Sequence, residues 1–156
     1  MTPSPMLRHA LARTAPVVVA LLAVGLSAGC SKPDFAVAPV AGTVTLGGEP
    51  LAGALVTFQP RASEGGILAG RPSVGETGPD GRYQLETYDG YEGAVVGTHR
   101  VSISTFRKKA AEGDSSSVVV IAEERVPARY NRQSELSVEV PSSGLGDCNF
   151  ELSSNK

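Results

Sequence analysis

Apolar and polar residues alternate along most of the chain after residue 40, and this alternation constrains the fold more than any other feature. In the stretch 54–59 the even-numbered positions carry Ala, Val and Phe, and in 99–105 the odd-numbered positions carry His, Val, Ile and Thr. A period of two sends successive side chains to opposite faces of an extended strand, so that one face can be buried. The sequence therefore predicts an all-β fold.

The same alternation predicts which residues form the core. The side chains expected on the inner face are those of Val40, Gly42, Val44, Leu46, Ala54, Val56, Phe58, Tyr83, Leu85, His99, Val101, Ile103, Thr105, Leu136, Val138, Val140, Cys148, Phe150 and Leu152. Glycine and proline separate the runs at 47–48, 78–81 and 141–144, where tight turns need their backbone geometry. Together, the runs and turns predict a β-sandwich of seven or eight short strands over residues 39–153.

Three stretches depart from this pattern. Arg107-Lys-Lys leads into residues 110–117, which are polar and contain glycine, so we expect an exposed and mobile loop there. Residues 118–122 are continuously apolar, which is typical of a buried strand. The excursion 87–97 carries Tyr88 and Tyr91, whose rings either offer a recognition surface or cap the end of the sandwich. Capping is the interpretation we favour.

The first 29 residues have the composition of a signal peptide. Arg8, His9 and Arg13 give a basic start, and the apolar run that follows, 15–26, leads to small residues before Cys30. At about a dozen residues this run is shorter than the ~20 that span a bilayer as a permanent helix. We therefore expect a signal-peptide helix in 1–29, followed by a linker over 30–38.

The residues around Cys30 suggest a lipid anchor. Leu26-Ser-Ala-Gly-Cys resembles a bacterial lipobox, although Ser27 stands where leucine is commonest. The resemblance implies that the Cys30 thiol is acylated and becomes the new N-terminus after cleavage. Several acyl chains would hold the protein stably on a membrane, whereas a single chain gives marginal binding. An ordinary signal peptide with an accidental cysteine, or an uncleaved anchor, is the alternative.

The charge balance argues against nucleic acid as a partner. Removing 1–29 takes away Arg8 and Arg13 of the 14 Lys and Arg and none of the 16 Asp and Glu, which leaves 12 against 16 and a charge near −4. Nucleic-acid binding depends on clustered cations that displace counterions from phosphates. The mature chain, with roughly 115 residues after the anchor, suits one domain with one core.

The sequence offers little for catalysis. After processing, His99 is the one histidine left, and Cys148 is the one cysteine besides Cys30. A single histidine gives no basis for a zinc site, and there is no Gly-x-Ser-x-Gly elbow for a hydrolase nucleophile. Cys148 falls on the expected inner face as a small core residue, with pairing between chains as the alternative. We therefore predict no enzyme, no cofactor and no metal site.

Four motifs carry a resemblance to a known family. Gly42-Thr-Val-Thr, Pro50-Leu-Ala-Gly-Ala-Leu-Val, Thr77-Gly-Pro-Asp-Gly-Arg-Tyr-Gln-Leu and Gly97-Thr-His-Arg-Val-Ser-Ile resemble the carboxypeptidase regulatory-like domain. The resemblance implies a transthyretin-like, or Ig-like, sandwich without an active site, because the peptidase chemistry of that family belongs to a separate zinc domain. The whole chain, including Val126-Pro-Ala-Arg-Tyr-Asn, also resembles small lipoproteins of planctomycete-type bacteria.

Two functional classes follow from these expectations. The first is a non-enzymatic cell-envelope lipoprotein whose sandwich is a structural or protein-interaction module, tethered to the membrane through Cys30. The second is a carbohydrate or extracellular-ligand binding module that uses the loop of Tyr88 and Tyr91. Few exposed aromatic residues are expected, which favours the first class and an envelope protein, rather than a glycan, as partner. Ser31 lacks the aspartate that retains some lipoproteins at the inner membrane, which leans towards the outer membrane.

Overall fold

The computed structural model describes residues 35–62, 70–111 and 114–154, apart from the side chains of 114–116. The chain divides into two units, residues 1–32 and 33–156, and all described residues belong to the second. The predicted signal peptide with its helix, Cys30 and most of the predicted linker therefore lie outside the described residues.

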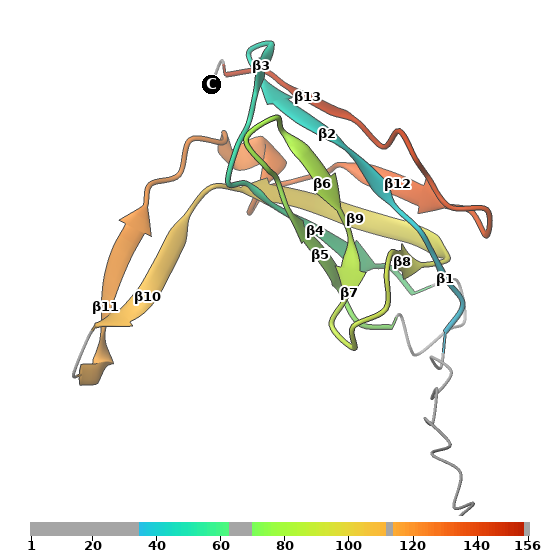
Figure 1. Cartoon of the computed structure of the whole chain (residues 1–156), viewed down its shortest axis with the longest axis horizontal. Helices are drawn as coiled ribbons and strands as arrows, with labels where there is room; N and C mark the ends of the chain where they lie inside the picture. The colour runs from blue at the N-terminus through green and yellow to red at the C-terminus, as the bar shows by residue number, and fades with distance from the viewer. Residues whose placement is uncertain (1–34, 63–69, 112–113, 155–156) are drawn as a thin grey trace, which may run out of the picture. The chain divides into compact units, whose positions relative to one another are not determined.

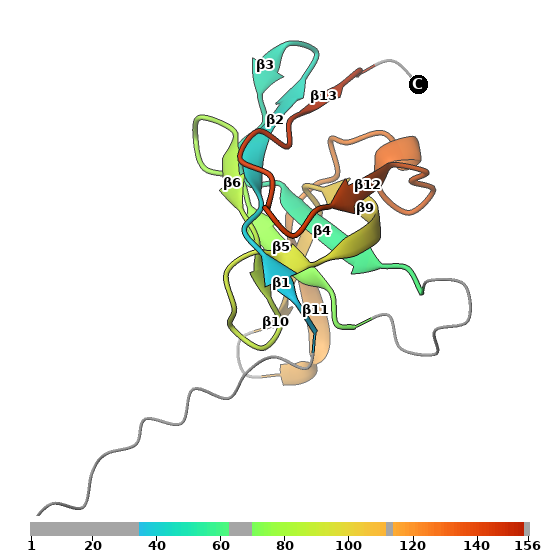
Figure 2. The ribbon, with the colours of Figure 1, turned by 90° about the vertical axis from the view of Figure 1, so that its right-hand side faces the viewer.

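Two β-sheets form the body of the molecule, which confirms the predicted all-β sandwich (Figures 1 and 2). The larger sheet has the strand order β12-β9-β4-β5-β7. Its strands are β4 (Leu55–Pro60), β5 (Ser73–Glu76), β7 (Glu86–Thr87), β9 (Gly97–Ser104) and β12 (Ser137–Val140). All neighbours in this sheet are antiparallel, and β4 pairs with β9 along its whole length, from Leu55 opposite Ser104 to Pro60 opposite His99.

The smaller sheet is built around β2 (Ala41–Leu46). Strand β2 pairs with β13 (Phe150–Leu152) in parallel, and with β3 (Glu49–Pro50) and β6 (Arg82–Gln84) in antiparallel orientation. A separate short ladder joins β1 (Val37–Ala38) to β8 (Ala94–Val95). Since Ala38 is already paired and buried, the folded domain begins slightly before the predicted end of the linker at residue 38.

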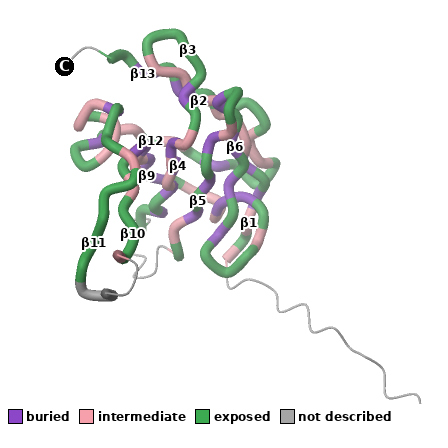
Figure 3. The backbone as a smooth tube through the Cα atoms, turned by 60° about the vertical axis from the view of Figure 1, so that its left-hand side comes forward, coloured by how far each residue is buried: buried purple, intermediate pink, exposed green. Residues whose placement is uncertain are grey.

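The core lies between the sheets and follows the predicted alternation. Val56 and Phe58 of β4 are fully buried, as are Ala54 just before it and Val101 and Ile103 of β9. The last strand joins the layers, because the Phe150 ring lies 6.3 Å from the rings of both Phe58 and Tyr83, measured between centroids. Figure 3 shows the buried segments concentrated in the sandwich. The prediction of the inner face is therefore confirmed for these strands.

A two-stranded hairpin projects from the sandwich and contradicts two predictions (Figures 1 and 3). β10 (Arg107–Ala111) and β11 (Asp114–Ala122) pair antiparallel with each other and with no other described strand. The predicted loop over 110–117 is therefore largely strand. The predicted buried strand 118–122 is exposed, with Val118 62% accessible. We call this hairpin, 107–122, the arm.

The described residues contain thirteen strand segments, more than the seven or eight predicted. Several are only two residues long, such as β3, which lies between turns that contain Gly47 and Gly48 on one side and Gly53 on the other. The arm adds two strands where a loop was expected. Pro127 precedes a single 3-10 turn, Ala128–Tyr130, in agreement with the bend that a proline favours.

Candidate interaction surface

Among the described strands, β11 of the arm carries the largest group of exposed apolar side chains. In β11 the accessible fractions are 62% for Val118, 47% for Val119, 48% for Val120 and 56% for Ile121. Single exposed apolar residues are common on proteins, but a contiguous group indicates an interaction surface or an aggregation risk. A two-stranded hairpin alone is also marginally stable in water. The arm is therefore the leading candidate for a functional surface.

The register of the arm distributes these side chains over both faces. The directly opposite pairs are Lys108 with Val120, Lys109 with Val119, and Ala110 with Val118. Opposite residues point to the same face and successive residues to opposite faces. One face therefore presents Val118 and Val120 and the other presents Val119, while Ile121 lies at the register irregularity between Val120 and Ala122. Both faces are exposed at these positions.

The two edges of the arm differ in how well they resist another strand. β10 carries Arg107, Lys108 and Lys109. Positive charges on an edge strand hinder the addition of another strand. β11 has no charged residue from 115 to 122. The two strands pair regularly over Val118–Val120, and Ile121 has no direct partner in β10. The edge of β11 is therefore the one open to a further strand.

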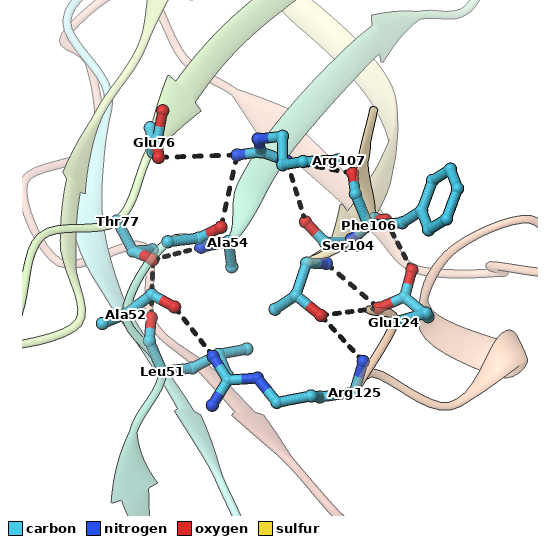
Figure 4. A network of polar contacts seen from close by, with 12 residues as sticks. Leu51, Ala52, Ala54, Glu76, Thr77, Ser104, Phe106, Arg107, Glu124 and Arg125 are labelled. Atoms are coloured by element: carbon cyan, nitrogen blue, oxygen red, sulfur yellow. Dashed lines mark hydrogen bonds and ion pairs between the residues drawn. The ribbon is translucent and has the colours of Figure 1, made fainter. Parts of the chain in front are cut away.

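The Glu124 carboxylate receives several hydrogen bonds at the base of the arm (Figure 4). It accepts hydrogen bonds from the backbone amides of Thr105 (3.0 Å) and Val126 (2.9 Å) and from the Ser104 hydroxyl. Partial burial alone would raise the pKa of Glu124, but these hydrogen bonds outweigh it and hold the pKa below its ordinary value. The carboxylate thus joins the chain entering β10 to the chain leaving β11.

Two arginines tie the same base to the loop before β4 (Figure 4). Arg107 donates to the Gly53 carbonyl (3.2 Å) and lies 3.6 Å from the Glu76 carboxylate, and Arg125 donates to the Ala52 carbonyl (2.9 Å). The Thr105 hydroxyl adds a link by accepting from the Arg125 amide at 2.7 Å. These contacts fix the base of the arm, whereas its strands remain exposed.

An open cleft lies beside the arm on the outer face of β9. It has a volume of about 650 Å³ and is lined by Arg100, Ser104, Phe106, Glu124 and Arg132, among others. Two of its charged groups have partners: Arg100 donates to the carbonyls of Ser134 and Arg132, and Glu124 accepts hydrogen bonds at the base of the arm. The cleft also extends the exposed surface beside the arm to Phe106.

Tyr88 and Tyr91 lie in one tight turn and have different surroundings. Tyr88 is 78% exposed, and the Arg71 guanidinium lies 5.4 Å from its ring centroid. Tyr91 is half-buried and lines a cavity of about 80 Å³ together with Phe35 and Val37. The turn is closed by hydrogen bonds between Thr87 and Tyr91. The Tyr91 ring thus contributes to the end of the sandwich, whereas the Tyr88 ring is exposed and caps nothing.

The His99 side chain is ionisable and fully buried in the core. Its Nε2 lies 2.6 Å from the Val95 carbonyl, and its Nδ1 has no hydrogen-bond partner among the described residues. Burial, the largest influence, lowers the pKa of His99 below 6.5 and outweighs the carbonyl, which acts in the opposite direction. The ring also packs 5.5 Å from that of Phe58. These surroundings suit a neutral packing residue.

Cys148 lies beside β2, where the C-terminal part of the domain meets its N-terminal part, and its amide donates to the Ala41 carbonyl. Its carbonyl accepts a hydrogen bond from the Tyr83 hydroxyl at 2.6 Å, and its thiol forms no disulfide among the described residues. Burial raises the pKa of the thiol and outweighs the Tyr83 hydroxyl, which lowers it. The side chain is half-buried against the core, which agrees with its expected position on the inner face.

No family model, curated protein or solved structure matches the chain. Within residues 35–62, 70–111 and 114–154, no three His, Cys, Asp or Glu side chains gather as metal ligands. The same part of the chain contains no helix with the length and hydropathy needed to span a membrane.

Sequence reasoning missed the arm, although a signal for it was present. A strand that contains Arg107-Lys-Lys cannot be buried on both faces, so a partner that pairs with it as a hairpin lies outside the core as well. The prediction of a buried strand at 118–122 takes no account of Arg107-Lys-Lys, the segment that pairs with it. Reading the cationic and apolar runs as one hairpin would have predicted an exposed strand.

Proposed function

We propose that this protein is a non-enzymatic cell-envelope lipoprotein whose β-sandwich is a protein-interaction module. The single observation that carries the interaction role is the arm, which exposes Val118–Ile121 on a strand edge that has no charged residue from 115 to 122. Strand addition to such an edge satisfies the backbone groups of both chains, and the exposed side chains then supply specificity. A partner strand on β11 would extend the arm from two strands to three, the size at which a small sheet gains independent stability.

The envelope location is part of the proposal and rests on the sequence. The basic start, the short apolar run and the lipobox-like residues before Cys30 support an acylated N-terminus. We further propose the carboxypeptidase regulatory-like family, on the four motifs that resemble it. Tethering would restrict the sandwich and its arm to partners at the same membrane, which raises their effective concentration.

Glycan binding through the tyrosine turn is the weaker candidate. It is favoured by one observation, the 78% exposure of Tyr88. A sugar platform usually needs several aromatic rings, whereas Tyr91 lines a cavity of only about 80 Å³. Binding to a glycan array that is lost in Tyr88→Ala would reverse this ranking.

Photo-crosslinking in intact envelope tests the interaction role directly. A photoreactive amino acid is placed in the full-length chain at Val119 on the arm and, as a matched exposed position, at Tyr88. We expect Val119 to yield a discrete protein adduct and Tyr88 to yield background. Adducts from Tyr88 alone, or from neither position, would contradict an interaction through the arm.

The lipid anchor needs its own measurement. Radiolabelled palmitate should be incorporated into the parent chain and not into Cys30→Ala, while Cys148→Ala should be labelled like the parent. Equal labelling of the parent and Cys30→Ala would remove the lipoprotein part of the proposal without affecting the arm.

A further inference from the structure

We propose that the cleft beside the arm binds a ligand that carries a carboxylate next to an apolar group, such as an acyl amino acid or the end of a peptide. Arg100 and Arg132 would hold the carboxylate, and Phe106 would contact the apolar group. This inference goes beyond the proposed function, because it concerns the outer face of β9 and does not depend on strand addition to β11.

The cleft has the dimensions of a small-molecule site. Its volume of about 650 Å³ lies within the range of roughly 300–1,000 Å³ that is typical of ligand pockets. Such pockets combine an apolar wall with a few polar groups that fix the orientation of the ligand. The apolar part of this wall consists of Phe106, Val126 and Ala128. The Phe106 ring is 41% exposed and extends away from the polar network in Figure 4.

Arg100 is held in place by the backbone and keeps unused donors. Its Nε donates to the Ser134 carbonyl at 2.9 Å, and its Nη2 donates to the Arg132 carbonyl at 3.1 Å. A guanidinium has five N–H groups, so three of them have no partner among the described residues. A side chain that is already oriented loses little further entropy when it binds a ligand. A carboxylate suits these donors, because its two oxygens can accept parallel N–H bonds from one guanidinium.

Arg132 and Ser102 contribute further donors to the same cleft. Within the part of the chain that the structure describes, neither the Arg132 guanidinium nor the Ser102 hydroxyl has a hydrogen bond or an ion pair. Arg132 is exposed, and Ser102 is half-buried on the outer face of β9. The cleft therefore presents three side chains with N–H or O–H groups that a ligand can use.

The charge of the cleft suits a single negative charge. Arg100 and Arg132 supply two positive charges, and Glu124 supplies one negative charge. Glu124 is ionised at neutral pH, because its hydrogen bonds hold its pKa below the ordinary value. One carboxylate would leave the occupied cleft neutral, whereas a phosphate dianion would add repulsion from Glu124. The whole chain has a net charge of −2, so the positive charge of the cleft is a local feature.

A second cleft of similar volume lacks these properties. It lies along β2 and β6, has a volume of about 620 Å³, and is lined by Glu76 and Asp147 as well as Arg82. The Arg82 guanidinium lies 3.4 Å from the Asp80 carboxylate, so its charge is already compensated. The unpaired arginine therefore distinguishes the cleft beside the arm.

Titration of the isotope-labelled full-length chain with N-acetylphenylalanine, followed by NMR, tests the site. N-acetylphenylalanine amide is the matched probe, because it keeps the aromatic ring and lacks the charge. We expect the acid to shift the amide signals of Ser102, Phe106 and Arg132, and to bind at least roughly tenfold more tightly than the amide. Equal binding of the two probes, or no shift of these signals, would overturn the proposal. Tighter binding of inorganic phosphate at the same signals would overturn the preference for a carboxylate.

A substitution at Arg132 connects the binding to a named donor. Arg132→Gln removes a charge that has no partner among the described side chains and keeps the carbonyl that Arg100 uses, so the fold should be retained. The affinity for N-acetylphenylalanine should fall roughly tenfold. Arg129→Gln is the matched control, because Arg129 belongs to the same segment and does not line this cleft. An unchanged affinity in Arg132→Gln, or an equal loss in Arg129→Gln, would contradict the assignment.

The carboxylate can come from a free small molecule or from a protein that also contacts the arm. Photo-crosslinking at Val119 in the presence of excess N-acetylphenylalanine separates these sources. A weaker adduct assigns the carboxylate to the partner of the arm, and an unchanged adduct assigns it to a free ligand, so either result keeps the site. Failure of the acid to bind overturns the site and leaves the interaction through the arm standing, whereas failure of the crosslinking alone overturns only the latter.

Discussion

Single residues hold the two ends of the domain together through close backbone contact. Gly42 of β2 lies so near the last segment that a Cβ placed on it would overlap the Cys148 carbonyl oxygen. The Tyr83 hydroxyl donates to the same oxygen, and burial, the largest influence, raises the pKa of that hydroxyl above its ordinary value. Residues more than 60 positions apart thus meet at one carbonyl.

Replacing Gly42 by alanine should destabilise the domain. The added methyl group meets backbone atoms of Cys148, which cannot move away as a flexible side chain could. We expect a loss of about 1–3 kcal/mol in the free energy of unfolding, measured by denaturant titration. Gly146→Ala is the matched control, because nothing lies within 4 Å of its added Cβ. Equal stability of the two variants would show that the ends of the domain do not approach this closely.

Burial of His99 should make stability depend on pH. The unfolded histidine takes up a proton near pH 6.5, whereas the folded one does so only at lower pH. Stability is therefore complete above pH 6.5 and falls as the pH drops towards the folded pKa, by at most about 1.4 kcal/mol per pH unit.

Thermal or chemical unfolding between pH 7 and pH 5 measures this slope. His99→Gln keeps a donor for the Val95 carbonyl and should flatten it. Glu124, whose pKa is also lowered, loses its contribution only below its ordinary value of 4.5, outside this window. The same slope in parent and His99→Gln would mean that another group titrates.

Residue-level prediction from the sequence succeeded where side chains alternate. The inward positions of β4 and β9 follow directly from the period of two. The contact of Gly42 with Cys148 could not be predicted. It depends on the parallel pairing of β13 with β2, and these two strands lie at opposite ends of the domain's sequence. A pattern along one strand does not say which strand lies beside it.

At the scale of elements, the arm is an exposed hairpin on a fixed base. Hydrogen bonds from both sides of the hairpin converge on Glu124, and Arg107 and Arg125 reach the loop before β4. Beyond this base, β10 and β11 pair only with each other among the described strands. The base therefore sets where the arm points, and the strands determine what it can bind.

Loss of the Glu124 carboxylate should loosen the arm while the sandwich stays folded. Glu124→Ala leaves the amides of Thr105 and Val126 without this acceptor, and we expect a cost of about 1 kcal/mol, since the site is partly open to water. Hydrogen exchange should become faster in residues 107–122 and stay unchanged in β4. Glu123→Ala is the adjacent control, with an unchanged pattern expected. Faster exchange in both variants would point to a general effect of charge.

The arm also shows where element-level prediction fails. A continuous apolar run such as 118–122 is compatible with a strand buried on both faces, and equally with an exposed strand that binds another chain. Periodicity cannot separate these cases, since neither alternates. The pairing of this run with Arg107-Lys-Lys decides between them, and pairing is a tertiary property.

At the scale of the whole molecule, the sandwich provides a stable body and the arm provides a surface that has no cover among the described residues. Core side chains of both sheets are fully buried, whereas Val118–Ile121 are each about half or more exposed. Such a division is typical of a module that folds alone and completes one sheet on binding. The account therefore depends on the edge of β11 being covered in the working protein.

Hydrogen exchange of β11 in the full-length protein tests this claim most directly. The parent chain and Val120→Lys are labelled in the native cell fraction that contains the protein and compared over residues 117–122. If a strand covers the edge, the outward amides of the parent should be protected to the level of the β4–β9 pair, and those of Val120→Lys should exchange rapidly. Rapid exchange of these amides in the parent, equal to that of Val120→Lys, would contradict the account.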